Sequence, residues 1–335
     1  MARIERHWYS LTPLHLVLLP LSLLFGLIAA IRRALYRGGI FRSEKLPVPV
    51  VVVGNITVGG SGKTPLALWL AQQLLEAGWH PGIISRGYRG SADSSQARSP
   101  REVSPDSSPF ETGDEPLLMA QRRLCPVWIG RDRPAAARAL LIAHPECDVI
   151  ISDDGMQHYR LRRDAEIAVV DGHRRIGNGF LLPAGPLREP VSRLNSVDAV
   201  VVNGGASGHG RFGMQLHGEL FHNLLNPQIT LQAGEFNGQR LHALAGIGHP
   251  ERFFRYLESL GLRITRHSLP DHHRYTPNDL AIEGADAILM TEKDAVKCAS
   301  FADEKCWVLR VDAQVDPALA QLIIRKIATH GRQAA

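Results

Sequence analysis

The sequence predicts an α/β fold in which a parallel sheet carries a phosphate-binding loop and a second, smaller α/β domain follows. Two observations predict this fold. Short β-branched runs alternate with helical patterns along most of the chain, and a glycine-rich loop follows the first of those runs. Because near-continuous apolar strands separated by helices are typical of sheets buried on both faces, we expect most strands to be parallel.

Composition limits the class of protein. The chain has 335 residues, 44% hydrophobic and 21% charged, which is globular and long enough for one large or two modest domains. A formal charge of +5 suits an anionic ligand, a membrane surface or nucleic acid. Nucleic acid is the least favoured partner, because no array of aromatic and basic residues occurs. The four cysteines have no CxxC spacing, so we expect reduced thiols and no zinc site.

The first element expected is an apolar helix. Residues 11–31 are almost uninterruptedly apolar and would extend about 31 Å as a helix, enough to cross a bilayer core. Arginines flank the segment on both sides, and no small-x-small cleavage site follows it, so a signal peptide is disfavoured. The basic residues after the segment would be attracted to anionic lipid headgroups. We therefore expect residues 1–45 to anchor the chain to a membrane.

The geometry of this anchor stays open at this point. Pro13 and Pro20 would disturb a straight spanning helix. His15, Ser22 and Gly26 would form a thin polar stripe on one helix face. An interfacial or half-inserted helix is therefore as plausible as a spanning one.

The strands and helices that follow predict two units. A core at residues 46–210 would contain strands at 48–53, 82–85, 127–129, 149–152, 167–170 and 199–202 and helices at 65–77, 115–124 and 134–143. A smaller domain at 211–335 would contain strands at 241–244, 264–265, 287–290 and 307–310 and helices at 251–259 and 317–329. Residues 204–213 resemble a linker, and residues 90–113 an exposed hairpin or flexible loop.

The loop after the first strand has the architecture of a P-loop NTPase-like core. Strand, glycine-rich loop, Gly62-Lys63-Thr64 and helix occur in the order that phosphate binding requires. Lys63 would reach the β- and γ-phosphates of ATP and act in catalysis, and the Thr64 hydroxyl would bind Mg²⁺. A glycine-rich turn with a surface lysine is the alternative. The residues expected to bind the nucleotide are Thr57, Val58, Gly59, Gly60, Ser61, Gly62, Lys63 and Thr64.

A second acidic motif would complete a metal site. The strand at 149–152 ends in Asp153 and Asp154, and P-loop enzymes hold Mg²⁺ with a carboxylate at such a strand end. Taken alone, Asp-Asp-Gly is more often a turn. After a P-loop at this distance, we expect both aspartates beside the metal, without deciding which one binds it directly.

Several motifs together resemble one family. GNITVGGSGKTP at 54–65 is followed by SRGY at 85–88, GDEP at 113–116, DDGMQH at 153–158, LPAGPLREP at 182–190, AGIGHPERF at 245–253, DHH at 271–273 and TEKDAVK at 291–297. In this order they resemble tetraacyldisaccharide 4′-kinase over nearly the whole chain. The resemblance accounts for Thr57, since the family's loop carries Ser or Thr where glycine is usual. It implies ATP-dependent phosphorylation of the 4′-hydroxyl of a tetraacyl glucosamine disaccharide 1-phosphate, giving lipid IVA.

The resemblance also implies roles for individual residues. Asp114 of GDEP matches the family's catalytic base, and His272 of DHH matches its partner. An aspartate can accept the acceptor hydroxyl's proton in a loose phosphoryl-transfer transition state. The alternative for Asp114 is a helix N-cap, and His273 is placed as well as His272 by composition alone.

The acceptor side is expected around six further residues. A guanidinium at a strand end can bind a phosphate bidentately, which makes Arg86 a candidate. The full set expected to bind substrate is Arg86, Tyr88, Gln157, His158, Arg188 and Glu189.

Two rival functions remain. A membrane-bound P-loop NTPase switch or motor would share the loop, the aspartates and the anchor, but would not need GDEP or DHH. A nucleotide-binding assembly subunit would tolerate loss of Asp114. The resemblance itself implies a kinase at the cytoplasmic face of the bacterial inner membrane, acting on a lipid with no protein partner required.

Overall fold

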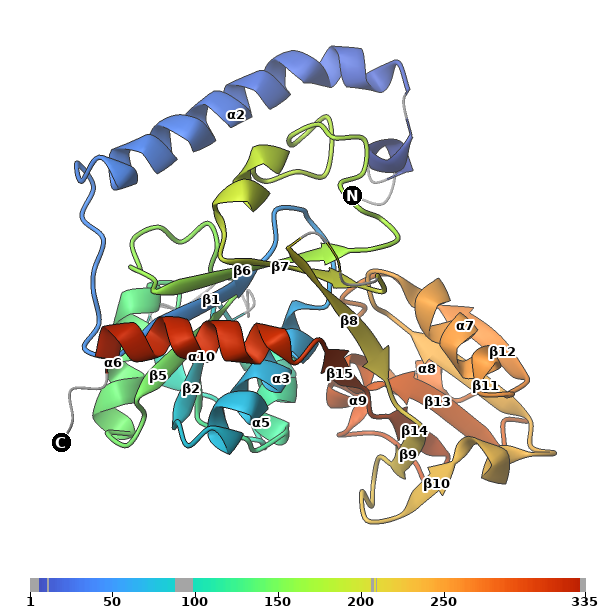
Figure 1. Ribbon diagram of the computed structural model, residues 1–335. Coiled ribbons are helices and arrows are strands. Elements are labelled where there is room, and N and C mark those ends of the chain that lie inside the picture. Colours follow the sequence, from blue (N-terminus) through green and yellow to red (C-terminus); the bar gives the residue numbers. More distant parts are fainter. Residues whose placement is uncertain (1–5, 11, 88–98, 206–207, 209, 332–335) are drawn as a thin grey trace.

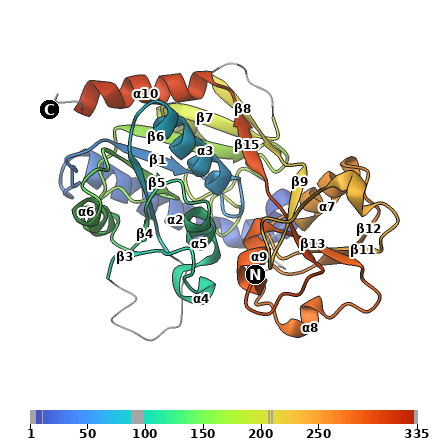
Figure 2. The ribbon, with the colours of Figure 1, turned by 90° about the horizontal axis from the view of Figure 1, so that it is seen from below.

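The chain forms two sheets that lie side by side. The computed structural model describes residues 6–10, 12–87, 99–205, 208 and 210–331 (Figure 1). A nine-stranded sheet is the larger unit and a six-stranded sheet the smaller one. Figures 1 and 2 show the smaller sheet beside the larger one, not stacked on its face.

The larger sheet has the strand order β15-β8-β7-β6-β1-β5-β2-β4-β3. All neighbours are parallel except the edge strands β3 and β15, which are antiparallel to theirs. The bounds are β1 Val50–Gly54, β2 Pro81–Ser85, β3 Arg101–Glu102, β4 Val127–Ile129, β5 Val149–Asp153, β6 Ala165–Asp171, β7 Ala199–Asn203, β8 Arg211–His217 and β15 Asp312–Val315.

Register brings the chemically important strand ends together. β1 lies between β5 and β6, and Val53 pairs with both Asp153 and Ile167. The loop after β1 therefore begins beside the acidic end of β5. Since ligands of parallel sheets bind at the carboxyl ends of the strands, this edge is where a site is expected.

Helices cover both faces of the larger sheet. Leucines of α3 (Lys63–Glu76) pack on one face with α5 (Asp114–Gln121) and α10 (Ala318–Gly331). α6 (Arg133–Ala143) covers the other face through small residues and Leu140. Both apolar layers are buried, which explains why β1 reads as an unbroken run of valines.

The smaller sheet has the order β10-β9-β14-β13-β11-β12. α7 (Pro250–Ser259) packs on one face through two phenylalanines, and α8 (Pro277–Leu280) and α9 (Glu292–Cys298) pack on the other. The strand bounds are β9 Leu220–Asn223, β10 Thr230–Gln232, β11 Leu241–Ala245, β12 Ile264–Ser268, β13 Ala287–Thr291 and β14 Cys306–Leu309. The short helical turns are η1 Arg6–Tyr9, α4 Pro109–Thr112, η3 Val191–Ser196 and η4 Ala233–Phe236.

The domain boundary expected between residues 210 and 211 does not coincide with the boundary between the two sheets. β8 and β15 pair with each other and extend the larger sheet, and α10 packs on it. Two strands and one helix of the expected C-terminal unit are therefore part of the unit built on the larger sheet. The expected linker at 204–213 also ends early, because β8 begins at Arg211. β15 at the edge and β8 next to it alternate polar and apolar residues, so they lack the continuously buried pattern of the central strands.

The apolar helix α2 (Leu14–Arg37) lies along the molecule with its apolar side outward. Only His15 and Ser22 are buried, whereas Leu16 is 75% exposed. The Ser22 hydroxyl donates to the Leu181 carbonyl at 2.7 Å. The polar stripe is therefore the side that contacts the protein, and the helix is, by length and composition, able to cross a membrane.

Candidate active site

The loop after β1 is shaped by its glycines and by two asparagines. Gly62, the N-cap of α3, has φ +93°, and a Cβ there would lie 2.4 Å from the Asn203 amide nitrogen. That amide donates to the Ser61 carbonyl at 3.0 Å, and the Asn55 amide donates to the Ser61 hydroxyl at 3.0 Å. The sequence interpretation did not assign Asn55 or Asn203 a role, although each follows an apolar strand. Their amides hold the loop in its open shape.

The start of the loop explains the missing glycine. Thr57 forms an antiparallel bridge with Leu187, and the Val58 amide donates to the Pro186 carbonyl at 2.8 Å. Thr57 does not have a positive φ, so a β-branched residue is tolerated there. The Val58 amide is therefore already bonded within the protein.

Lys63 and Asp154 meet at the centre of the site. Lys63 Nζ lies 3.6 Å from Asp154 Oδ1, and Arg188 Nη1 donates to both Asp154 oxygens at 3.1 and 3.2 Å. Burial favours the neutral acid, but Lys63 and Arg188 outweigh it and lower the pKa of Asp154 to about 2. Asp154 has φ +48°, a strained conformation for aspartate that often accompanies functional sites.

Asp153 differs from its neighbour. Its side chain is fully buried at the end of β5, where Oδ2 accepts from the Ser85 hydroxyl at 3.3 Å. Oδ1 has no hydrogen-bond partner within the described part of the chain. Burial, and next the Glu115 carboxylate, raise the pKa of Asp153. A buried carboxylate oxygen left without a donor fits a hard cation such as Mg²⁺.

Asp114 and His272 meet between the two sheets. His272 Nδ1 lies 3.2 Å from Asp114 Oδ2, although 158 positions separate them in sequence. Lys293 Nζ lies 3.8 Å from the same oxygen. Burial opposes ionisation of Asp114, but the hydrogen bond from His272 and the charge of Lys293 lower its pKa to about 2. The same hydrogen bond raises the pKa of His272, although burial acts against it.

The alternatives for this pair can be compared with the structure. Gly113, not Asp114, is the N-cap of α5, and Asp114 is the first helical residue. His273 Nε2 lies 3.4 Å from an Asp279 carboxylate oxygen. His272 has φ +58°, which turns its ring toward α5. The capping interpretation of Asp114 is therefore wrong, and His272 is the histidine in contact with it.

The residues expected on the acceptor side are only partly brought together. The Gln157 amide donates to Glu189 at 2.8 Å, and its carbonyl oxygen accepts from Arg188 at 3.1 Å. His158 lies close by; burial, and next the charge of Arg133, lower its pKa to about 4. Arg86 is exposed just after β2. Tyr88 lies outside the described residues.

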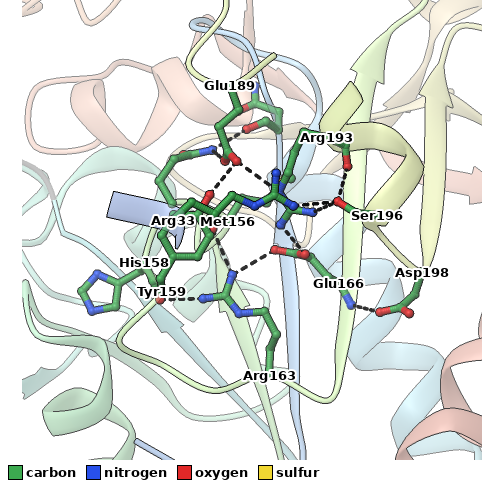
Figure 3. Close-up of polar contacts among 12 residues, drawn as sticks. Arg33, Met156, His158, Tyr159, Arg163, Glu166, Glu189, Arg193, Ser196 and Asp198 are labelled. Atoms are coloured by element: carbon green, nitrogen blue, oxygen red, sulfur yellow. Dashed lines mark hydrogen bonds and ion pairs between the residues drawn. The ribbon is translucent and has the colours of Figure 1, made fainter. Parts of the chain in front are cut away.

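Four residues around this site were not identified from the sequence. Tyr159 donates to Glu189 at 2.6 Å, and Arg193 bridges Glu189 and Glu166 (Figure 3). The buried Arg133 donates to the Asp153 carbonyl at 2.9 Å. Little in the sequence indicated them, because an isolated arginine, tyrosine or glutamate belongs to no spacing motif. These residues are Tyr159, Glu166, Arg133 and Arg193.

A cavity of about 190 Å³ adjoins the loop at Val58 and Gly59. Its lining includes Trp8 and Tyr9 before α2, Gly59 of the loop, Arg174 after β6 and Pro250 of the smaller unit. The Arg174 guanidinium stands 5.5 Å from the centre of the Tyr9 ring. Three parts of the chain thus meet beside the phosphate-binding loop.

Comparison with known proteins identifies the family. The model of the LpxK family, tetraacyldisaccharide-1-P 4′-kinase, matches residues 14–328. The chain belongs to this family. It is 52% identical to the tetraacyldisaccharide 4′-kinase of Methylobacillus flagellatus over 324 residues, which cover 97% of this chain and 95% of that protein. The corresponding protein of Azoarcus sp. is also 52% identical, with the same coverage.

A solved structure agrees with the fold. The crystal structure of LpxK from Aquifex aeolicus in complex with ATP has a TM-score of 0.78 and 31% identity, covering 94% of this chain and 99% of that one. The predicted α/β fold and the resemblance drawn from the motifs are therefore confirmed. The family's members are kinases, and the match to an ATP complex supports ATP as the phosphoryl donor.

Proposed function

We propose that this chain transfers the γ-phosphoryl group of ATP to the 4′-hydroxyl of a tetraacyldisaccharide 1-phosphate, giving lipid IVA. The observation that carries the proposal is the Asp114–His272 contact in a chain of the 4′-kinase family. A carboxylate held ionised beside a phosphate-binding loop suits a base that receives a hydroxyl proton. A switch or motor needs no such base.

The reaction balances with these residues. The acceptor oxygen bonds to the γ-phosphorus as the bond from that phosphorus to the bridging oxygen breaks, and ADP leaves. The hydroxyl proton passes to the Asp114 carboxylate. His272 holds that carboxylate in orientation, and Lys63 neutralises charge on the phosphate oxygens. In such a loose transition state, positioning and charge supply most of the acceleration.

We propose that Thr64 and Asp153 hold Mg²⁺ and that Asp154 acts through Lys63 and Arg188. The orphan Oδ1 of Asp153 supports the first part, and the two ion pairs of Asp154 support the second. The bound ion would neutralise negative charge on the transferring phosphoryl group.

This assignment has a test besides activity. Mg²⁺ should raise the unfolding temperature of the ATP-bound wild type and of Asp154→Asn, but not of Asp153→Asn. Asp154→Asn should instead weaken ATP binding, because Lys63 loses its partner. If Mg²⁺ stabilises Asp153→Asn as strongly as the wild type, the direct-ligand assignment is wrong.

The acceptor and the nucleoside take opposite sides of the loop in this proposal. Gln157, His158, Arg188 and Glu189, with Arg86 and Tyr88, would bind the disaccharide phosphate. The cavity lined by Trp8, Tyr9 and Arg174 would receive the part of ATP beyond its phosphates. Aromatic and guanidinium faces suit a purine ring.

We also propose that α2 anchors the protein at the cytoplasmic face of the inner membrane, lying in the interface. Its outward apolar side and inward polar stripe support this geometry. ATP is available on the cytoplasmic side, and leaving the acyl chains in lipid avoids a cost of about 0.8 kcal/mol per CH₂. The double change Leu16→Asp and Leu23→Asp should release the protein from vesicles. Ile142→Asp, at an equally exposed apolar site on α6, should not.

The expected two-domain organisation is retained as a proposal with altered bounds. Residues 218–311 would form the smaller domain, because β8, β15 and α10 belong to the larger sheet. Arg252 donates to Asn203 at 2.7 Å, and Arg174 donates to the Gly248 carbonyl, so the units already touch beside the loop. Closure there would exclude water and limit wasteful ATP hydrolysis.

The test of the whole function is direct. Purified protein incubated with γ-labelled ATP should label the disaccharide 1-phosphate, detected as a new lipid by chromatography. The wild type should consume ATP much faster when the acceptor is present. Equal consumption without acceptor, and no labelled lipid, would favour the NTPase switch.

A further inference from the structure

A polar network joins α2 to the acceptor side of the site, and the buried Arg193 is at its centre. The Arg193 side chain, on η3, is 3% exposed. Its guanidinium donates to Glu189 from Nε at 3.1 Å, to Ser196 from Nη1 at 2.9 Å, and to Glu166 from Nη2. All three nitrogens are therefore bonded (Figure 3). Such a guanidinium fixes the direction of each partner.

On the inner side, the network continues to the P-loop lysine. Glu189, held by Arg193, accepts from the Gln157 amide, and Gln157 in turn accepts from Arg188. Arg188 pairs with Asp154, which pairs with Lys63. Each step is a direct side-chain contact between buried or half-buried groups, so a shift of Arg193 would displace Arg188 and Glu189.

On the outer side, two contacts reach α2. Arg33 Nη2 donates to the Ser196 hydroxyl at 2.8 Å, and the same hydroxyl accepts from Arg193. Ser196 donates its own proton to the Arg193 carbonyl at 2.9 Å, so both acceptor positions and its one donor are used. Independently, the Arg32 guanidinium stands 5.8 Å from the Tyr159 ring, and Tyr159 donates to Glu189.

The contacts are unusual for a helix whose other side faces outward. Two guanidinium groups meeting at one hydroxyl repel each other, and Arg193 is among the groups that lower the pKa of Arg33 after burial itself. An anchor that served only to hold the chain near lipid would not need contacts to Ser196 and Tyr159, which bond Arg193 and Glu189 respectively. The geometry therefore joins the helix to the site rather than merely to the protein surface.

We propose that Arg193 is a positioning residue through which Arg33 of the anchoring helix sets the geometry of the acceptor-binding pair Arg188 and Glu189. This inference rests on the proposed acceptor phosphorylation. The consequence is that docking of α2 against η3 raises productive binding of the lipid, beyond bringing the enzyme to the membrane.

The test avoids removal of Arg193 itself. Loss of that side chain would remove a cationic partner from each of two buried carboxylates, Glu166 and Glu189, and could unfold the protein. Arg33→Ala and Ser196→Ala change partly or well exposed residues instead. Arg37→Ala is the matched control, because it removes the same charge from the exposed last turn of α2.

The full chain is assayed in anionic phospholipid vesicles containing the disaccharide 1-phosphate. Arg33→Ala should lower kcat/KM for the acceptor roughly 3- to 10-fold more than Arg37→Ala, as for loss of one hydrogen bond to a charged group. The KM for ATP and recovery on vesicles should match those of Arg37→Ala. Arg33→Lys should restore part of the loss, and the Arg33→Ala and Ser196→Ala pair should be no worse than the poorer single variant.

Two outcomes would overturn the inference. One is equal acceptor kinetics in Arg33→Ala and Arg37→Ala, and the other is a fully multiplicative loss in the pair of changes. A wild type that fails to phosphorylate the lipid would instead overturn the proposed function, so the two failures are distinguishable.

Discussion

The phosphate-binding corner and the Asp114–His272 corner are built in different ways. The first lies within one sheet, where β1, β5 and the start of α3 are fixed by strand pairing and a buried core. The second is assembled between two sheets, from the first residue of α5 and a loop after β12. The geometry of the first corner is fixed within one sheet, whereas that of the second depends on how the two units pack against each other.

The difference bears on the proposed roles of the two corners. Lys63 and Asp154 both belong to the larger unit, so their contact does not depend on the smaller one. His272 and Lys293 reach Asp114 from the smaller unit. If Asp114 is the base that we propose, closure of the two units would complete it and would couple proton transfer to exclusion of water.

The largest expected effect is at the phosphate-binding corner. Lys63→Ala should lower kcat/KM about 10³-fold, or ~4 kcal/mol, because the lysine neutralises charge that develops on the phosphate. The fold should persist, since only the Asp154 pairing is lost. Lys305→Ala, at an exposed position after α9, is the control. A folded Lys63→Ala protein with near-normal kinase activity would remove the loop from the site.

A change at the Asp114–His272 corner should lower kcat without weakening ATP binding. Asp114→Asn should lower kcat by roughly 10²- to 10⁴-fold, because an amide cannot accept the proton. The KM for ATP should change little, and the unfolding temperature should drop by only a few degrees. Glu111→Gln, a neighbouring exposed carboxylate, is the isosteric control.

A second variant tests whether the two residues act as a unit. His272→Ala should also lower kcat, and its combination with Asp114→Asn should be barely worse than Asp114→Asn alone. A multiplicative loss in the combined variant would mean that the residues act independently.

The two corners also differ in how far the sequence could predict them. The P-loop and the acidic strand end were predicted from local order, because strand, turn and helix are consecutive there. Asp114 and His272 were paired only through the resemblance to a family. No local pattern links residues so far apart, and the residue itself favoured the helix cap that Gly113 occupies.

The strands β8 and β15, at one edge of the larger sheet, were also not predicted from the sequence. β8 and β15 alternate polar and apolar residues instead of forming the continuous apolar runs by which the central strands were predicted, and the glycine-rich residues before β8 favoured a linker there. Their pairing joins chain segments about a hundred residues apart, which only the tertiary structure defines. Arg193 was missed for the same reason, because its carboxylate partners come from β6 and from the loop before η3.

The smallest expected effect is the pH dependence that the Asp114–His272 contact gives to the unfolding temperature. The hydrogen bond to Asp114 raises the pKa of His272 above its ordinary value, while Asp114, with a pKa of about 2, stays ionised near neutrality. The protonated histidine therefore stabilises the fold fully below its unfolded pKa of about 6.5. That contribution is lost as the pH rises through the higher folded pKa.

His272→Asn is the suitable variant to test this, because asparagine tolerates the positive φ at this position. Unfolding temperatures of both proteins should differ most near pH 6 and converge as the medium becomes alkaline, since all other titrating groups are shared. A difference that stays constant from pH 5.5 to 9, or grows with pH, would mean that the contact does not bind a proton more tightly in the folded state.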